Sequence, residues 1–118
     1  MTMENPWNEP LINVEHNSQS LKISKEIYLR ILAKAVAQTR EDIKNLEAAL
    51  PVGKFDAVQA ISHRLKGDYD NMRIVRLSSL AKELNEIVRT TQDKSRMIEV
   101  VTEFKDYFQK LEAFLSAS

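Results

Sequence analysis

The chain has 118 residues, 43% hydrophobic and 29% charged, a balance typical of one compact domain rather than a disordered tail. Its 17 basic residues equal its 17 acidic ones, so it lacks the positive charge expected of a nucleic-acid-binding protein. The absence of cysteine excludes disulfides and thiolate metal sites, and no apolar run approaches the roughly 18 residues of a membrane span. We therefore expect a cytoplasmic protein that binds neither nucleic acid nor membrane.

Residues 1–20 show no sustained hydrophobic period, and Pro6 and Pro10 interrupt the backbone. We expect an extended or short-helical N-terminal lead-in that packs on the rest of the chain. Trp7 is expected to cover an edge of the core, and His16 is expected to be solvated. The polar N-terminus does not have the pattern of a signal peptide.

The first of four amphipathic segments follows this lead-in. A helix is predicted to begin after Ser24, a typical N-cap residue, and to end near Leu50, because Pro51 disfavours helix at the preceding residue. Its apolar face is predicted to consist of Ile27, Tyr28, Ile31, Leu32, Ala35, Val36, Ile43, Leu46, Ala49 and Leu50.

Three more helices are predicted, the first starting within residues 54–56 and the last following a break with capping residues at 90–93. Each of these helices has a stripe of apolar residues along one face. In chain order the three stripes are Phe55, Val58, Ile61, Leu65, Tyr69 and Met72; Leu77, Leu80, Ala81, Leu84, Ile87 and Val88; and Met97, Val101, Phe104, Phe108, Leu111 and Leu115. An isolated helix gains most of its stability by burying such a stripe. The pattern therefore predicts an all-α fold, an antiparallel up-down four-helix bundle over residues 21–118, behind the lead-in of residues 1–20.

One histidine of the second predicted helix points away from the core. A helix turns by about 100° per residue, so His63 lies about 140° from Val58, the centre of the apolar stripe. Lys66 lies about 60° from His63, and Gly67 within about 40° of it one turn later. Glycine inside an exposed helix costs roughly 1 kcal/mol relative to alanine, which suggests that something must approach closely there.

A lone exposed histidine is usually inert, and a nearby lysine is usually a solvated charge. The combination is more specific, because a neutral imidazole is a good nucleophile near pH 7. With Lys66 offsetting charge and Gly67 giving access, His63 has the surroundings of a phosphoryl carrier.

The stretch His63-Arg64-Leu65-Lys66-Gly67 resembles the H-x-L-K-G motif of the histidine phosphotransfer (HPt) domain family of two-component phosphorelays. The likeness extends to the helices on either side and covers roughly residues 20–115. It implies a phosphocarrier rather than an enzyme, with His63 relaying a phosphoryl group between the aspartates of response-regulator receiver domains. A hybrid sensor kinase would feed the relay.

The resemblance also implies roles for other residues. Lys66 would support the charge of the phosphoryl group, and Gly67, Arg64 and Asp70 would lie on the receiver docking face. Asn85, 22 residues after the histidine, matches a side-chain amide that orients the imidazole in several members. We expect no cofactor and no metal site of the protein's own, with Mg²⁺ held by the receiver partner.

The chain departs from the family pattern at two positions. Asp70 stands seven residues after His63, where the family usually has a small residue, and Arg73 stands ten residues after it, where glycine is usual. The Asp70 carboxylate lies some 10 Å along the helix, so its repulsion of a phosphoryl group in water is under about 1 kcal/mol. We expect these changes to affect partner choice more than chemistry, and Arg73 to mark a differently shaped turn.

Two other functions remain open from the sequence. The protein could be an HPt-like binding protein that docks a kinase or receiver domain without carrying phosphate, or an unrelated structural bundle. No phosphate-cradling loop or nucleotide motif is present, so the chain is not expected to be a kinase. Met1 and the complete set of four helices favour a free-standing protein over a domain cut from a larger hybrid kinase. The protein is expected to be a monomer.

Overall fold

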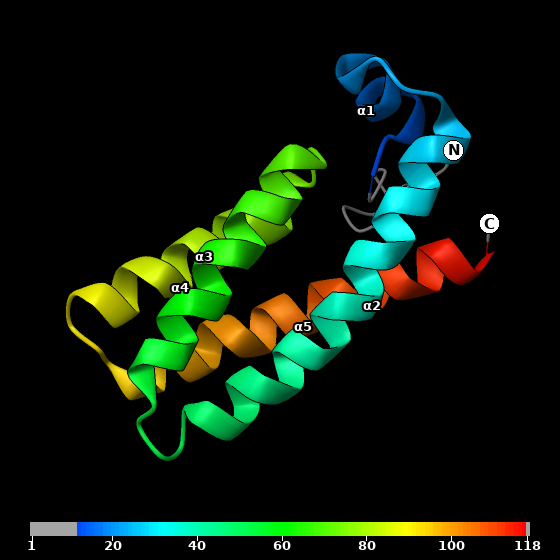
Figure 1. Cartoon of the computed structure of the whole chain (residues 1–118). Helices are drawn as coiled ribbons and strands as arrows, with labels where there is room; N and C mark the ends of the chain where they lie inside the picture. The colour runs from blue at the N-terminus through cyan, green and yellow to red at the C-terminus, as the bar shows by residue number, and fades with distance from the viewer. Residues whose placement is uncertain (1–11, 118) are drawn as a thin grey trace, which may run out of the picture.

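The computed structural model describes residues 12–117, which contain only helices as regular secondary structure (Figure 1). The all-α class predicted from the sequence is therefore confirmed. The prediction for Trp7 lies outside the described residues. The helices are α1 (Val14–Leu21), α2 (Lys25–Ala49), α3 (Phe55–Asn71), α4 (Val75–Arg89) and α5 (Lys94–Ala117).

Side-chain caps set the starts of several helices. Ser24 begins α2 as predicted, because its hydroxyl oxygen accepts a hydrogen bond from the backbone N–H of Ile27 at 3.1 Å. At the start of α5, the Asp93 carboxylate accepts the N–H of Arg96 at 3.2 Å. Asp93 is the last residue of the break predicted at residues 90–93. These short-range caps satisfy N–H groups that a helix leaves free in its first turn.

The turn between α3 and α4 contains a residue in the left-handed conformation. Arg73 has φ of 63°, and the N–H of Ile74 bonds back to the carbonyl oxygen of Tyr69 at 2.9 Å, as in a Schellman-type helix end. This is the position ten residues after His63, and its geometry favours glycine. The Arg73 guanidinium Nε donates to Ser20 Oγ at 3.2 Å, so the side chain also links this turn to α1.

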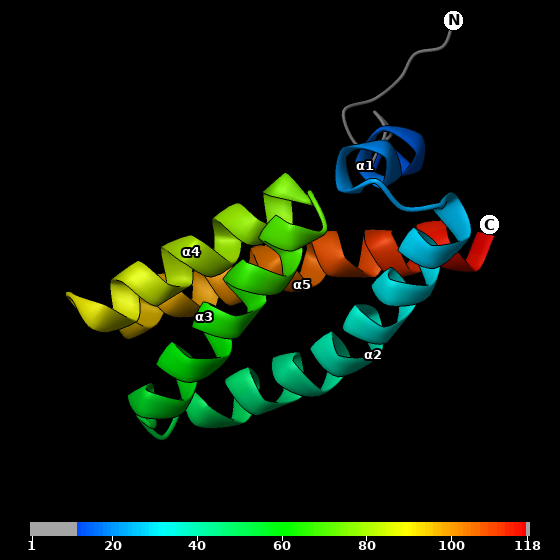
Figure 2. The ribbon, with the colours of Figure 1, turned by 45° about the horizontal axis from the view of Figure 1, so that its top comes forward.

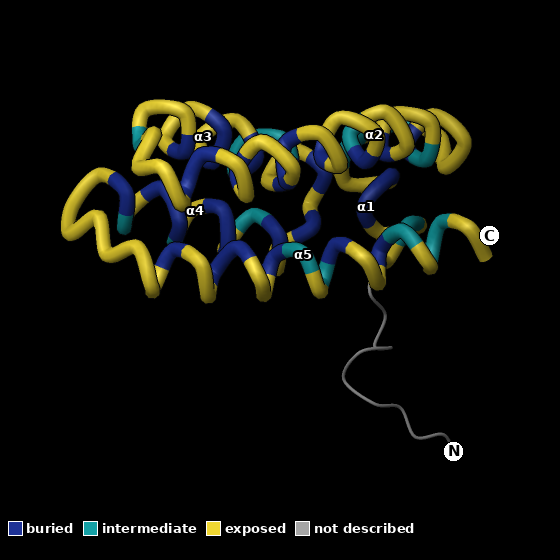
Figure 3. The backbone as a smooth tube through the Cα atoms, turned by 90° about the horizontal axis from the view of Figure 1, so that it is seen from below, coloured by how far each residue is buried: buried dark blue, intermediate teal, exposed yellow. Residues whose placement is uncertain are grey.

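The four long helices contact one another in a ring. Helix α3 packs between α2 and α4, and α5 packs against α4 and α2, while α1 packs on α2 (Figures 1 and 2). Coloured by burial, the backbone shows that the buried positions lie on the facing sides of the helices (Figure 3). The largest fully buried side chains include Tyr28, Tyr69, Phe108, Leu65 and Leu77.

Two predicted core positions are wrong. Ile27 and Ile31 are 42% and 44% exposed, whereas Tyr28 and Leu32 beside them are fully buried. Neighbouring positions lie about 100° apart around a helix, so the first half of α2 buries one line of side chains rather than two. The apolar stripe is narrower here than its sequence pattern suggests.

A buried tyrosine connects three parts of the fold. Tyr28 donates its hydroxyl to the carbonyl oxygen of Met72 at 2.7 Å and accepts from Asn17 Nδ2 at 3.1 Å. Burial raises the pKa of Tyr28, the bond from Asn17 opposes that rise, and the neutral hydroxyl is the form that can donate. Helix α1, helix α2 and the end of α3 are thereby held in a fixed relation.

Candidate functional site

His63 lies in the middle of α3 and is exposed, as its position on the helical wheel predicts. Ile61 and Leu65, on either side of it in sequence, are buried in the core. Among residues 12–117, no group forms a hydrogen bond or ion pair with the imidazole. Helix α3 therefore holds a histidine outward with both ring nitrogens open to an incoming group.

Beside His63 is an open hollow of about 570 Å³ between α3 and α4. An open hollow of this kind suits the approach of a partner's side chains better than it suits the enclosure of a small molecule. The hollow brings His63 and Asn85 together, as the register of an antiparallel hairpin predicts. It is lined by Asp56, Gln59, Ala60, His63, Asn85 and Arg89.

Asn85 lies on α4 and is 6% exposed. Its side-chain amide nitrogen donates hydrogen bonds to α3. Nδ2 donates to the carbonyl oxygen of Gln59 and to Ser62 Oγ, both at 3.1 Å. In an α-helix the carbonyl of residue 59 also accepts the backbone N–H of residue 63, so Asn85 braces the turn that carries His63. These two acceptors fix the orientation of the amide and leave its oxygen, Oδ1, without a protein partner among the described residues.

Gly67 is not required by packing within the chain. A Cβ atom added at this position would meet no other atom within 4 Å, so alanine would fit without displacing anything. Glycine inside a helix is nevertheless destabilising by roughly 1 kcal/mol relative to alanine. Lys66 is half-buried and is not among the residues that line the hollow. Lys66 and Gly67 therefore flank His63 on the side toward the end of α3.

Arg64 is tied to α2. Its guanidinium pairs with the carboxylate of Asp42, whose side chain is only 1% exposed, and Gln38 Nε2 donates to the same oxygen at 3.2 Å. The other oxygen, Asp42 Oδ2, has no hydrogen-bond partner among the described residues. The Arg64 side chain is still 45% exposed, so it remains available at the surface beside His63.

The carboxyls near Arg64 differ in their surroundings. Burial raises the pKa of Asp68, Arg64 opposes the rise, and the nearby charge of Asp42 adds to it. Asp70 is exposed, and among the described residues its carboxylate forms no hydrogen bond or ion pair. Between these carboxyls, Tyr69 is buried and shares a 2.6 Å hydrogen bond with Thr39 Oγ1.

Several residues of this region were not found from the sequence. Asp42 sits beside Ile43 near the predicted apolar face of α2, but its partner could not be known before the helices were placed. Arg89 lies four residues after Asn85 and so on the same face of α4. That spacing is the signal that could have located it.

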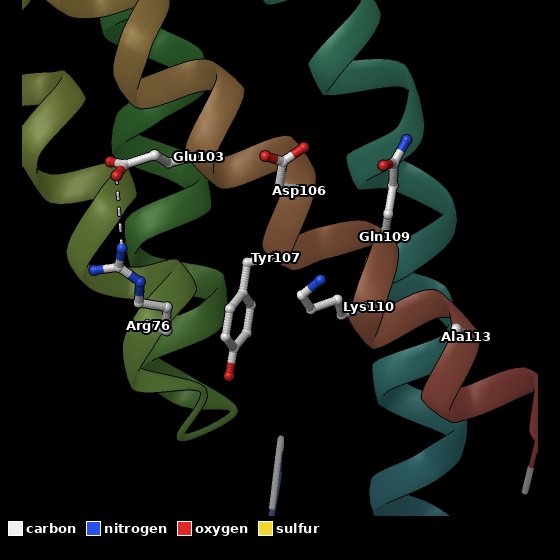
Figure 4. A pocket seen from close by; sticks show the side chains of 7 residues that line it. All are labelled: Arg76, Glu103, Asp106, Tyr107, Gln109, Lys110 and Ala113. Atoms are coloured by element: carbon white, nitrogen blue, oxygen red, sulfur yellow. Dashed lines mark ion pairs between the residues drawn. The ribbon is translucent and has the colours of Figure 1, made fainter. Parts of the chain in front are cut away.

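In the described part of the chain, no cluster of three or more His, Cys, Asp or Glu residues is placed to hold a metal ion. Another hollow, drawn in Figure 4, lies between the start of α4 and the second half of α5. Its wall includes Arg76, which faces Glu103 at 4.0 Å, and Tyr107. None of the predicted site residues lines it.

The model of the Hpt domain family matches residues 30–114, which is most of the chain. The chain belongs to the Hpt domain family. It is a histidine phosphotransfer protein of the phosphorelay type, a carrier rather than an enzyme, and Hpt domains interact with receiver and kinase domains. The resemblance seen in the sequence is thereby confirmed.

The fold is also similar to a crystal structure, that of histidine-containing phosphotransfer protein B (HptB) from Pseudomonas aeruginosa PAO1. The two chains are 23% identical, with a TM-score of 0.79, over 93% of this Hpt chain and 95% of the other. At this identity the match shows the fold. No curated protein sequence matches the chain. None of the described helices has the length and apolar character needed to cross a membrane.

Proposed function

We propose that His63 is the phosphoryl carrier of this Hpt domain, taking the group from one receiver aspartate and passing it to another. The observation that carries the proposal is the outward position of His63 beside an open hollow, with the unfilled space at Gly67 on its other side. His16, the other histidine of the chain, is exposed on α1, away from this constellation.

The transfer step requires a ring nitrogen with a free lone pair. That nitrogen attacks the phosphorus, an N–P bond forms, and the P–O bond to the aspartate breaks as the carboxylate leaves with the electron pair. The ring becomes positively charged while phosphorylated and keeps its proton on the other nitrogen. The reverse step returns the phosphoryl group to the next aspartate.

Asn85 is proposed to hold that second nitrogen. Its amide hydrogens are occupied by Gln59 and Ser62, so Oδ1 is the atom left to accept the ring N–H. Such a bond would fix the tautomer and stabilise the charged ring. Lys66 would offset the charge of the phosphoryl oxygens from one turn further along α3.

The docking face is proposed to consist of Gly67, Arg64 and Asp70. Gly67 leaves room for the partner's backbone, while Arg64, held by Asp42, and the exposed Asp70 present charges of opposite sign. The partners are receiver domains and a hybrid sensor kinase, and the Mg²⁺ that neutralises the transferring group belongs to the receiver. We propose that the protein acts as a cytoplasmic monomer, without a cofactor of its own.

The scaffold is proposed to be an antiparallel up-down four-helix bundle formed by residues 21–118, with residues 1–20 as its lead-in. The ring of contacts among α2, α3, α4 and α5 supports this description, as do the short connections between successive helices. Each connection is too short for a parallel return, so neighbouring helices run in opposite directions.

The test is transfer from a phosphorylated receiver domain, followed by assay for acid-labile, base-stable label on the Hpt chain. Wild type and His16→Gln should be labelled, whereas His63→Gln should carry no label while remaining folded. If His63→Gln is labelled as well as wild type, the assignment of His63 is wrong. If wild type binds receivers but none of those tried labels it, the binding protein without phosphate becomes the better description.

A further inference from the structure

The ion pair between Arg64 and Asp42 joins α3 to α2, and Arg64 follows His63 in the chain. The Asp42 side chain is 1% exposed, and its oxygen Oδ2 has no hydrogen-bond partner among the described residues. By contrast, the carboxylates of Glu47 and Glu112, in ion pairs that join α2 to α5, are 46% and 28% exposed. The pair next to His63 therefore differs from these two in having a buried carboxylate.

This pair is a costly way to join two helices. A buried carboxylate loses its hydration, and an unpaired carboxylate oxygen adds a further loss. Apolar side chains of similar size commonly join helices at least as well. Stability alone therefore does not account for a buried charge at Asp42.

The buried carboxylate restrains one part of the Arg64 guanidinium and leaves the rest at the surface. Guanidinium has five N–H donors, and among the described residues Arg64 makes a hydrogen bond only to Asp42. The side chain is 45% exposed on the side of α3 toward α2, whereas the hollow beside His63 lies toward α4. A positive group with free donors is therefore presented to a protein that docks over His63.

We infer that Asp42 is a positioning residue for receiver docking, which holds Arg64 beside His63 so that its free N–H groups bind a carboxylate of the receiver; this inference rests on the proposed function of His63. An unrestrained arginine loses side-chain entropy when a partner binds it, which weakens binding about three- to tenfold. The bond to Asp42 imposes this restriction before the receiver arrives. A carboxylate is the group that matches the planar fork of guanidinium.

The test compares two phosphoryl donors. One is a receiver domain, phosphorylated by acetyl phosphate and selected because it labels wild type, and the other is phosphoramidate, which has no docking surface. With phosphoramidate, a ring nitrogen of His63 attacks the phosphorus, the N–P bond to the imidazole forms, and the original P–N bond breaks as ammonia leaves with a proton from water. The parent chain carries His16→Gln and no histidine tag, so His63 is its only histidine.

Asp42→Asn keeps the size of the side chain and removes its charge. It should raise KM for the phosphorylated receiver about three- to tenfold, while kcat and the rate of labelling by phosphoramidate stay at the parent values. Asp42→Leu should give the same result and provides a second variant if the first does not fold. In a chain that already carries Arg64→Gln, Asp42→Asn should change KM by less than about twofold, because Asp42 acts through Arg64.

Glu47→Gln is the matched control, since it also removes a negative charge from α2 and breaks an ion pair between helices, with Lys105 at 3.0 Å. Its KM should equal that of the parent. The KM of the parent should also rise more steeply with salt than the KM of Arg64→Gln, because the docking contact joins two charges.

The inference is overturned, while the role of His63 stands, by any of three results. These are a parent KM in both folded Asp42 variants, an equal rise of KM in Glu47→Gln, and an effect of Asp42→Asn that is the same with and without Arg64. Equal salt dependence in the parent and Arg64→Gln would overturn the assignment of a carboxylate on the receiver. If the receiver that labels wild type does not label the parent, the label is not on His63, and the proposed function and this inference both fail.

Discussion

The two sides of α3 differ in how far their polar groups are used within the fold. Toward α2, Arg64 is paired with Asp42, and Tyr69 shares a hydrogen bond with Thr39. Toward α4 and the solvent, His63 has no partner in the described part of the chain. Apart from Asp42 Oδ2, these polar groups toward α2 are paired within the fold, whereas the imidazole beside α4 is left open for a phosphoryl group and a partner. The same 17-residue helix thus carries, at adjacent residues, a side chain tied into the fold and an imidazole left open.

Leu65 and His63 lie two residues apart in the motif but differ in burial. Leu65 is only 2% exposed, whereas His63 is exposed to solvent. Leu65→Ala should lower the free energy of unfolding by about 2–5 kcal/mol, since it removes a core side chain and leaves a cavity. Chemical denaturation measures the loss, and transfer by the folded fraction should be unchanged. A loss of transfer with unaltered stability would mean that Leu65 acts in phosphoryl transfer and not only in the core.

At Gly67, in contrast to Leu65, we expect a substitution to affect phosphoryl transfer. Gly67→Leu should reduce transfer from a phosphorylated receiver at least tenfold, because the side chain would occupy the space through which the partner approaches. Labelling by phosphoramidate, which is small, should persist. Ala33→Leu, at an exposed site on α2, is the control for an added apolar side chain. Unchanged receiver transfer in Gly67→Leu would show that close approach at this position is not needed.

A smaller side chain at Gly67 is expected to change the stability of the fold. Gly67→Ala should raise the free energy of unfolding by roughly 0.5–1 kcal/mol, because the Cβ meets no atom and alanine restricts the unfolded chain. Thermal unfolding by circular dichroism would detect the change. A decrease in stability would indicate a contact or backbone strain at Gly67 that is absent from the described geometry.

The smallest expected effect concerns Asp68. Its pKa is raised mainly by burial, so folding favours the protonated form. The contribution of Asp68 to folding stability is fully present below the pKa of this carboxyl in the unfolded chain. That contribution is lost as pH rises through the pKa of Asp68 in the folded protein. Asp68→Asn should therefore be more stable than wild type at neutral pH, with a difference that shrinks as the solution is acidified. Urea midpoints at several pH values check this, and a difference that grows in acid would contradict the sign.

Much of this arrangement could be predicted from the sequence because it depends on short-range patterns. Helical period placed His63 outward and Leu65 inward, and Ser24 marked the start of α2. The likeness of the motif to the HPt family located the candidate site within the correct fold.

The remainder depends on long-range packing. The pairing of Arg64 with Asp42 joins residues 22 positions apart on different helices, which no local pattern specifies. Arg73 adopts a left-handed conformation that sequence statistics assign to glycine. The exposure of Ile27 and Ile31 follows from how much of α2 its neighbours cover, which depends on the placement of whole helices.

The most direct test of the central claim is to locate the phosphoryl group itself. The chain is labelled by a phosphorylated receiver, kept at neutral to alkaline pH, and fragmented in a mass spectrometer by a method that preserves N–P bonds. The proposed mechanism predicts that the modification lies on His63 alone. Modification of His16, or of no histidine in a labelled chain, would contradict it.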